Sequence, residues 1–277
     1  MTTIIDLKEF RERFVTYVSY LYVRNNISFS NISDKIVYSE TFRFLDDNNV
    51  SSFLQMPYED FVYVLFNDHA KYYESKIPVE LLWALDQYIT VGLNLFIPIR
   101  RLFLLCPISE MIELFPVYHE MNEIQLVDYF KNNIINRNIF KSLKKKVNIT
   151  YHELSVLTGI NLNTLKNFDK DNNFLYNTSF SNINALQKLF QIDSSILNKE
   201  SNLLIIDRHV LENSLVRSNM INFLNNYYKS EVDIINYQPI FQIKVNNKTI
   251  YPADYIFEQA YRYTTKTYLE NSNNLLF

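Results

Sequence analysis

Six side chains of the segment 161–170 would point outward if that segment were a helix. They are Asn161, Leu162, Asn163, Lys166, Asn167 and Lys170. An asparagine amide can pair with an adenine edge, a lysine can contact a phosphate, and a leucine can touch a thymine methyl group. The segment contains no arginine, so strong reading of guanine is not expected. These residue types predict contact with an A·T-rich half-site of double-stranded DNA.

A lysine cluster lies upstream of this segment. Lys141, Lys144 and Lys145 have the spacing of one helical face, and Lys146 is beside them. We expect Lys144, Lys145 and Lys146 to contact phosphate; the alternative is a solvated lysine face. Residues 138–200 carry 8 basic and 5 acidic side chains, whereas residues 1–137 carry 12 and 18, and residues 201–277 carry 7 and 7. Residues 138–200, the only region with a net positive charge, therefore contain both the segment 161–170 and the lysine cluster.

The elements that would position these side chains are two helices joined by a tight turn. Thr150 and Glu153 have the spacing of a capping box, which predicts a helix that begins at the next residue, Tyr151. Gly159 is one of only two glycines in the chain, and it suits the left-handed conformation at a helix C-terminus. Leu154 and Leu157 are expected to point inward.

The second helix has its own start signal and its own apolar face. Asn161 can cap it, and Leu165 and Phe168 are expected to be buried. Ile160 would fill the corner between the helices, and Ser155 is small where they must approach each other closely. This spacing predicts helix-turn-helix geometry.

The stretch LSVLTGINLNTLKNFDKD resembles the Cro/repressor-like, or Xre, helix-turn-helix family. The resemblance covers residues 138–200 only. It departs from the family in a longer, Asn-rich loop at 171–179 and in Ser155, where the family has a small alanine. It implies a five-helix domain whose second motif helix enters the major groove, and a homodimer that reads two half-sites. The residues similar to its fourth and fifth helices are Ile183, Leu186, Leu189, Phe190 and the segment QIDSSIL.

Residues 1–137 are expected to form a multi-helical domain of unassigned role. Apolar residues recur at spacings of three and four from Leu7 to Leu21, and Pro57, Pro78 and Pro107 stand where prolines begin helices. The fold class is therefore mainly α.

Residues 201–277 are expected to be helical from about Asn202 to Tyr228 and again from about Ala253. Between these helices, Phe241, Ile243 and Val245 alternate with polar residues, and a two-residue Asn-Asn turn leads into a returning strand. The prediction is a helix-hairpin-helix region.

Several kinds of chemistry are not expected. A single cysteine, Cys106, excludes an intrachain disulfide, and its apolar neighbours predict a buried thiol. His119 and Glu120 lack the second histidine of a zinc-protease helix. No metal, cofactor or catalytic set is expected, and the chain is not predicted to be an enzyme. The N-terminus does not resemble a signal peptide, and charges interrupt the most apolar region, so we expect a cytoplasmic protein without a membrane span.

The leading hypothesis is a sequence-specific transcriptional regulator, acting as a homodimer, of a low-GC bacterium or its mobile element. The alternative is a protein-interaction factor of a phage or host-defence system, for example an inhibitor. In that case residues 1–137 bind a protein partner and the helix-turn-helix is autoregulatory. Residues 1–137 have an excess of acidic side chains, which would repel DNA, and this is compatible with the alternative. An enzyme of unrecognised type is a third alternative.

Overall fold

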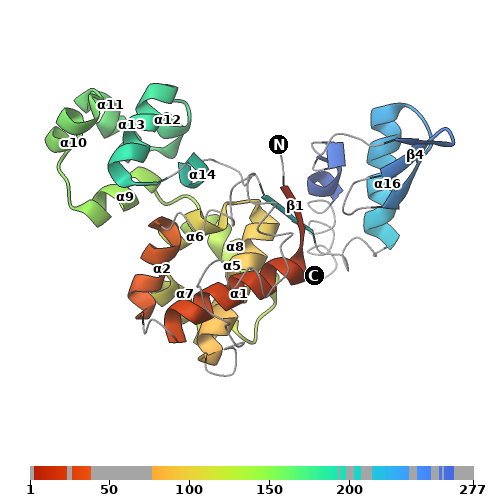
Figure 1. Cartoon of the computed structure of the whole chain (residues 1–277), viewed down its shortest axis with the longest axis horizontal. Helices are drawn as coiled ribbons and strands as arrows, with labels where there is room; N and C mark the ends of the chain where they lie inside the picture. The colour runs from red at the N-terminus through yellow and green to blue at the C-terminus, as the bar shows by residue number, and fades with distance from the viewer. Residues whose placement is uncertain are drawn as a thin grey trace. The chain divides into compact units, whose positions relative to one another are not determined.

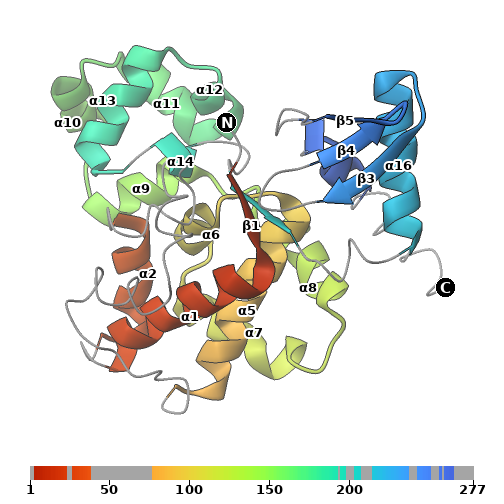
Figure 2. The same ribbon diagram turned by 45° about the vertical axis from the view of Figure 1, so that its right-hand side comes forward.

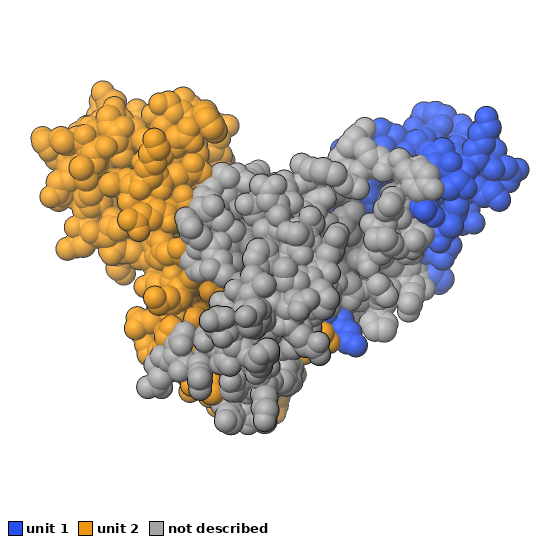
Figure 3. Space-filling view, viewed as in Figure 1, with its two compact units in different colours: residues 1–8, 204–277 blue, residues 9–203 orange. Residues whose placement is uncertain are grey.

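A computed structural model describes most of the chain outside the segment 39–76. The described residues are 3–23, 27–38, 77–192, 194–197, 203–206, 214–236, 242–250, 256–257 and 259–264. Within them the protein is mainly helical with a small three-stranded antiparallel sheet, which confirms the expected mainly-α class. The chain divides into two compact units (Figure 3), a large unit Glu9–Leu203 and a small unit of Met1–Lys8 with Leu204–Phe277. Residues on both sides of the boundary predicted at 137/138 belong to the large unit, so that boundary stays a prediction.

The first group of helices in the large unit is separated mainly by prolines. Pro78 and Pro107 each stand immediately before a helix, as the sequence predicts, and Pro98 also precedes one, because a proline fits where the first backbone N–H groups have no partner. Pro57 lies outside the described residues. The elements are α1 (Leu7–Val23), α2 (Phe29–Tyr38), α5 (Val79–Leu95), α6 (Ile99–Leu105), α7 (Ile108–Tyr118), α8 (Glu123–Tyr129) and the π-helix η4 (Phe130–Ile134).

Aromatic side chains fill the core between these helices. The Phe103 ring stacks on Tyr88 with centroids 3.8 Å apart and meets Phe14 edge-on at 6.0 Å. The Tyr88 hydroxyl donates to the backbone carbonyl of Cys106. The Cys106 side chain is buried, and its burial raises the pKa of the thiol well above its ordinary value. The predicted buried thiol is confirmed.

A second group of helices, α9–α14, forms a lobe of its own within the large unit (Figures 1 and 2). The segment expected to be a long loop contains a short helix, α12, which its neighbour Asp171 caps. The elements are α9 (Ile139–Val147), α10 (Tyr151–Thr158), α11 (Leu162–Lys170), α12 (Asn172–Tyr176), α13 (Phe180–Phe190) and α14 (Ser194–Leu197).

The small unit contains the predicted hairpin and more β structure than expected. Asn246 and Asn247 have φ angles of 48° and 63°, as a two-residue hairpin turn requires. Ile243 lies opposite Ile234 on one side and Ile250 on the other, so a third strand precedes the hairpin. The elements are β1 (Thr3–Asp6), β2 (Leu203–Ile206), α16 (Ser214–Tyr228), β3 (Val232–Asn236), β4 (Gln242–Val245) and β5 (Lys248–Ile250).

The predicted start of the helix after residue 200 is wrong. The helix expected from about Asn202 is α16, which begins at Ser214, and Leu203–Ile206 is the strand β2. This strand pairs with β1, about 200 residues earlier in the chain, in a two-stranded sheet. Pairing between distant segments overrides the local helical pattern.

No described helix is both long and apolar enough to cross a bilayer by itself. Helices α5 and α6 pass the same test only as a pair, and they are bent by 113° where they meet.

Candidate nucleic-acid interface

Helix α10 begins and ends where the sequence predicts. The Thr150 backbone N–H donates to the Glu153 carboxylate at 2.9 Å, and the Glu153 N–H donates to the Thr150 hydroxyl oxygen at 3.3 Å. The hydrogen bond from the Thr150 side chain also lowers the pKa of Glu153. At the other end, Gly159 has a φ of +70° and donates to the Ser155 carbonyl at 2.9 Å. The capping box and the glycine turn are confirmed.

Removing the cap should weaken this lobe. Thr150→Ala leaves the N-terminal N–H groups of α10 without their side-chain acceptor, so we expect a loss of about 1 kcal/mol in the free energy of unfolding. Urea unfolding followed by circular dichroism measures it. Thr150→Ser keeps the acceptor and should stay close to the parent protein. Equal stabilities for the alanine and serine variants would contradict a structural role for the capping box.

Helix α11 buries one face and exposes the other. Leu165 is fully buried and Phe168 is 1% exposed, with the Phe168 ring 5.6 Å from that of Phe140. Its packing partners include α9, α10 and α12. The opposite face carries a polar row of residues three and four apart: Asn163, Lys166, Asn167 and Lys170. Asn167 is half-buried, and the other three are exposed.

The other two predicted base-reading residues are placed differently. Asn161 caps α11, and its amide oxygen accepts the Asn163 N–H at 2.8 Å. Bidentate pairing with adenine needs the amide oxygen and the amide nitrogen together, and the capping bond already uses one lone pair of the Asn161 oxygen and fixes the direction of its amide. Leu162, in the first turn, is half-buried. The predicted pairing with adenine is therefore better suited to Asn163 and Asn167.

Lys144 takes part in an internal cluster. Its ammonium lies 3.6 Å from the Asp169 carboxylate and 3.6 Å from the centroid of the Tyr151 ring. The Tyr151 hydroxyl donates to the same carboxylate at 2.5 Å. The cluster joins α9, the first turn of α10 and the last turns of α11. Its role in the structure is to hold α11 in place, and the sequence contains no local signal for it.

The three predicted phosphate lysines do not share one environment. Lys146 makes an ion pair with Asp34 of α2 and lies 5.7 Å from the centroid of the Tyr38 ring. Partial burial lowers the pKa of Lys146. Lys145 is exposed. Lys146 is exposed as well, but Lys144 and Lys146 both make ion pairs within the protein, whereas Lys145 makes none with another described residue.

A seam of asparagine contacts connects the start of α9 to α11 and α12. The Asn138 amide donates to the Phe168 carbonyl at 2.7 Å, and the Asn172 amide donates to the Arg137 carbonyl at 2.9 Å. The Asn172 amide oxygen also accepts the Ile139 N–H at 2.9 Å. Sequence analysis missed both asparagines. An N-cap signal could have found Asn138, whose oxygen accepts the Lys141 N–H, but its contact with Phe168 joins positions thirty residues apart.

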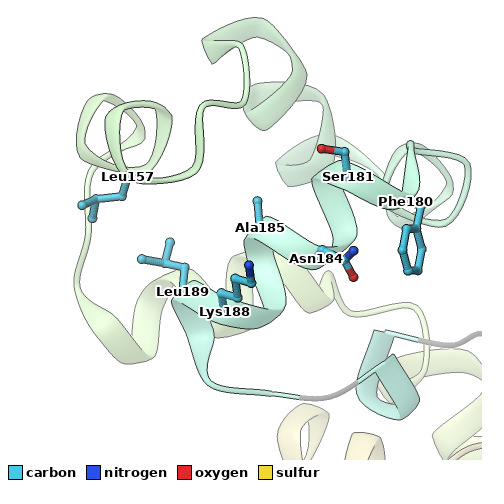
Figure 4. Close-up of a pocket in the computed structure, with 7 residues that line it drawn as sticks. All are labelled: Leu157, Phe180, Ser181, Asn184, Ala185, Lys188 and Leu189. Carbon is cyan, nitrogen blue, oxygen red and sulfur yellow. The ribbon is translucent and has the colours of Figure 1, made fainter.

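The expected inward position of Leu157 is wrong. Leu154 is fully buried, but Leu157 is 63% exposed. The half-buried residues Ser155 and Thr158 complete the inner face of α10, and both donate hydrogen bonds to nearby carbonyls, at 2.7 and 2.6 Å. Leu157 lies outside this face and lines an open pocket of about 640 Å³ with residues of α13 (Figure 4).

Neither a metal-binding cluster nor a likeness to a known protein assigns a function to the described residues. Within the part of the chain that the structure describes, no three His, Cys, Asp or Glu side chains are grouped so that they could hold a metal ion. No protein-family model matches the chain, and no curated protein and no solved structure matches it.

Proposed function

We propose that the chain is a sequence-specific DNA-binding regulator that reads the major groove with α11. The observation that carries this proposal is the row Asn163, Lys166, Asn167 and Lys170, which lies opposite a fully packed apolar face. Amides and ammonium groups on one side of a short helix are the groups that pair with adenine and phosphate. The geometry supports the Xre-like interpretation of residues 138–200 because a capped helix, a left-handed glycine and a second capped helix follow one another.

The surroundings of α11 support the same proposal. The described packing partners of this helix belong to its own lobe, so its polar row stays accessible within the large unit. Asp169, the acidic residue of the helix, interacts with Lys144 and Tyr151. The charge that α11 presents outward is therefore the positive charge of Lys166 and Lys170. An accessible, positively charged helix face is what phosphate contact requires.

The proposal can be tested without knowledge of the operator. The full chain is incubated with a pool of randomised DNA duplexes, bound molecules are amplified, and the enriched sequence is then titrated at several salt concentrations. We expect an A·T-rich sequence whose affinity falls as salt rises, since phosphate contacts release counterions. No enrichment over repeated rounds, or binding that is independent of salt, would overturn the proposal.

Lys145 and Lys146 should differ in this titration. Lys145→Gln is expected to reduce affinity for every duplex and to flatten the dependence of log affinity on log salt by about one unit, because one phosphate contact is lost. Lys146→Gln should leave that slope unchanged, since Asp34 already neutralises its ammonium. Equal slopes for the parent protein and both variants would remove Lys145 from the interface.

The alternative is an interaction factor that binds another protein. The observation that favours it is apolar exposure on the same lobe, where Leu157 is 63% and Phe180 is 78% exposed. Under this alternative the enriched DNA sequence is absent, and the chain co-purifies with a defined protein after nuclease treatment. Retention of that complex by a chain with charge reversals in α11 would favour the alternative over the DNA-reading proposal.

A further inference from the structure

A strip of aromatic side chains lies where α7 packs against α5 (Figure 2). The Trp83 ring of α5 meets the Phe115 ring of α7 edge-on, with centroids 5.5 Å apart. The His119 ring stacks on Phe115 at 4.5 Å, and its Nδ1 lies 2.8 Å from the Phe115 carbonyl oxygen. Val79 stands one turn before Trp83 on the same side of α5. We call Val79, Trp83, Phe115 and His119 the aromatic strip.

The aromatic strip is open to solvent. Val79 is 63% exposed, His119 is exposed, and Trp83 and Phe115 are half-buried. Trp83 is the only tryptophan of the chain. Tryptophan is enriched at protein interfaces, because its large ring supplies much contact area at a small cost in side-chain entropy. A tryptophan that shares a surface with two further rings and an exposed valine therefore marks a binding surface.

The helices around the strip expose negative charge and no lysine or arginine. Residues 77–130 contain seven acidic side chains, and their only basic side chains are Arg100 and Arg101. Both arginines are buried, at 1% and 4% exposure. Two of the seven acidic residues make ion pairs with arginines outside this segment. The surface formed by α5, α7 and α8 thus presents carboxylates that lack a cationic partner.

Two of these carboxylates lie beside the aromatic strip. Glu80 precedes Trp83 by three residues in the first turn of α5. Glu120 follows His119, its carboxylate is 3.5 Å from the His119 Nε2, and its side chain is 85% exposed. Within the described part of the chain, neither glutamate makes an ion pair with a lysine or an arginine. Aromatic faces and free carboxylates therefore occur together on one surface.

We propose that the aromatic strip binds an arginine-bearing segment of another protein, an inference that does not depend on the proposed DNA contacts of α11. A guanidinium group stacks on aromatic rings, of which tryptophan attracts cations most strongly. Glu80 and Glu120 are placed to accept its N–H groups, and charge-assisted hydrogen bonds of this kind are the strong ones. Val79 offers an apolar contact to a neighbouring aliphatic side chain of the same segment.

The charge and the size of the surface restrict the partner further. The carboxylates repel phosphate groups, so nucleic acid and an anionic lipid surface do not suit this strip. A folded partner typically buries about 800 Å² on each side, which four side chains do not supply. A short segment is the better fit. Arginine is favoured over lysine because its planar group is more weakly hydrated and stacks on rings.

The fluorescence of Trp83 in the full chain tests this proposal, because no other tryptophan contributes. The probe is a synthetic peptide of alternating arginine and leucine with both ends capped, and two control peptides carry lysine or glutamate in place of arginine. We expect a saturable change in Trp83 emission with a Kd of about 10 to 500 μM for the arginine peptide. The lysine peptide should bind at least threefold more weakly, and the glutamate peptide should not bind.

Matched charge reversals locate the binding site. Glu120→Lys should weaken binding of the arginine peptide at least fivefold, because it replaces an attractive contact with repulsion. Glu231→Lys makes the same change in net charge at an exposed residue of the small unit, and it should keep the parent affinity. Circular dichroism verifies that both variants are folded.

Four results would overturn the proposal. They are the absence of saturation up to about 1 mM peptide, an equal response to the glutamate peptide, equal affinity for the arginine and lysine peptides, and equal effects of the two charge reversals. The readout is separate from DNA binding. A chain with Lys166→Glu and Lys170→Glu should bind the arginine peptide as the parent does, so failure of the proposed function leaves this test intact.

Discussion

A chain that carries both Lys166→Glu and Lys170→Glu is expected to lose affinity for the enriched DNA sequence by roughly 100-fold or more. Both side chains are exposed on the outward face of α11, where they present the positive charge of that helix. Reversal removes two attractive contacts with phosphate and adds repulsion at the same two points. Fluorescence anisotropy with a labelled duplex measures the change at fixed salt.

A control with the same change in net charge separates local contact from overall electrostatics. Lys35→Glu with Lys131→Glu reverses two exposed lysines on α2 and η4, outside the α11 lobe. This control should lose far less affinity than the α11 double variant. If both double variants lose affinity equally, the overall charge of the protein accounts for binding and α11 is not the reading helix.

The largest loss of stability is expected for Phe168→Ala. Phe168 is 1% exposed, its ring meets Phe140 edge-on, and it stands directly behind the polar row of α11. Truncation leaves a cavity that this small lobe cannot fill, so the free energy of unfolding should fall by about 3–5 kcal/mol. Urea unfolding of the full chain, with circular dichroism as the readout, gives the value.

Phe180→Ala is the matched control for this prediction. Phe180 has the same side chain, but it is 78% exposed, so its truncation should change the free energy of unfolding by about 0.5 kcal/mol or less. Both variants are measured at the same low protein concentration. A similar loss in the two variants would mean that the burial of Phe168 does not stabilise the lobe.

Local signals were sufficient to predict the backbone of α10, the Gly159 turn and α11, but not the short helix α12. The capping box at Thr150, the left-handed position of Gly159 and the cap at Asn161 each depend on neighbouring residues only. Burial of Leu165 and Phe168 followed from their spacing on one helix. The Asn-Asn turn of the hairpin was predictable for the same reason, since two positive φ angles select residues that tolerate them.

Contacts between distant positions could not be read in this way. Lys146 and Asp34 are separated by 112 residues, and nothing near either residue identifies the other. The lysine spacing indicated one basic face, but neighbouring helices engage Lys144 and Lys146 and leave Lys145 exposed. The exposure of Leu157 depends on the position of α13, which helical periodicity in the sequence does not predict. Pairing of β1 with β2 joins segments that are about 200 residues apart in the sequence.

If the proposed function holds, the asparagine seam at the start of α9 has a consequence for which DNA the protein occupies. Asn138 and Asn172 leave no flexible tether between the lobe of α11 and the residues that precede it, and Arg137 is itself held by the Glu110 carboxylate at 2.6 and 2.8 Å. Under the proposed function, the acidic first half of the chain would be carried with α11 to every duplex it meets. Its repulsion would lower the affinity for specific and non-specific duplexes alike, because both present phosphates. Only a duplex that adds the amide contacts with adenine would then hold the chain at low protein concentration.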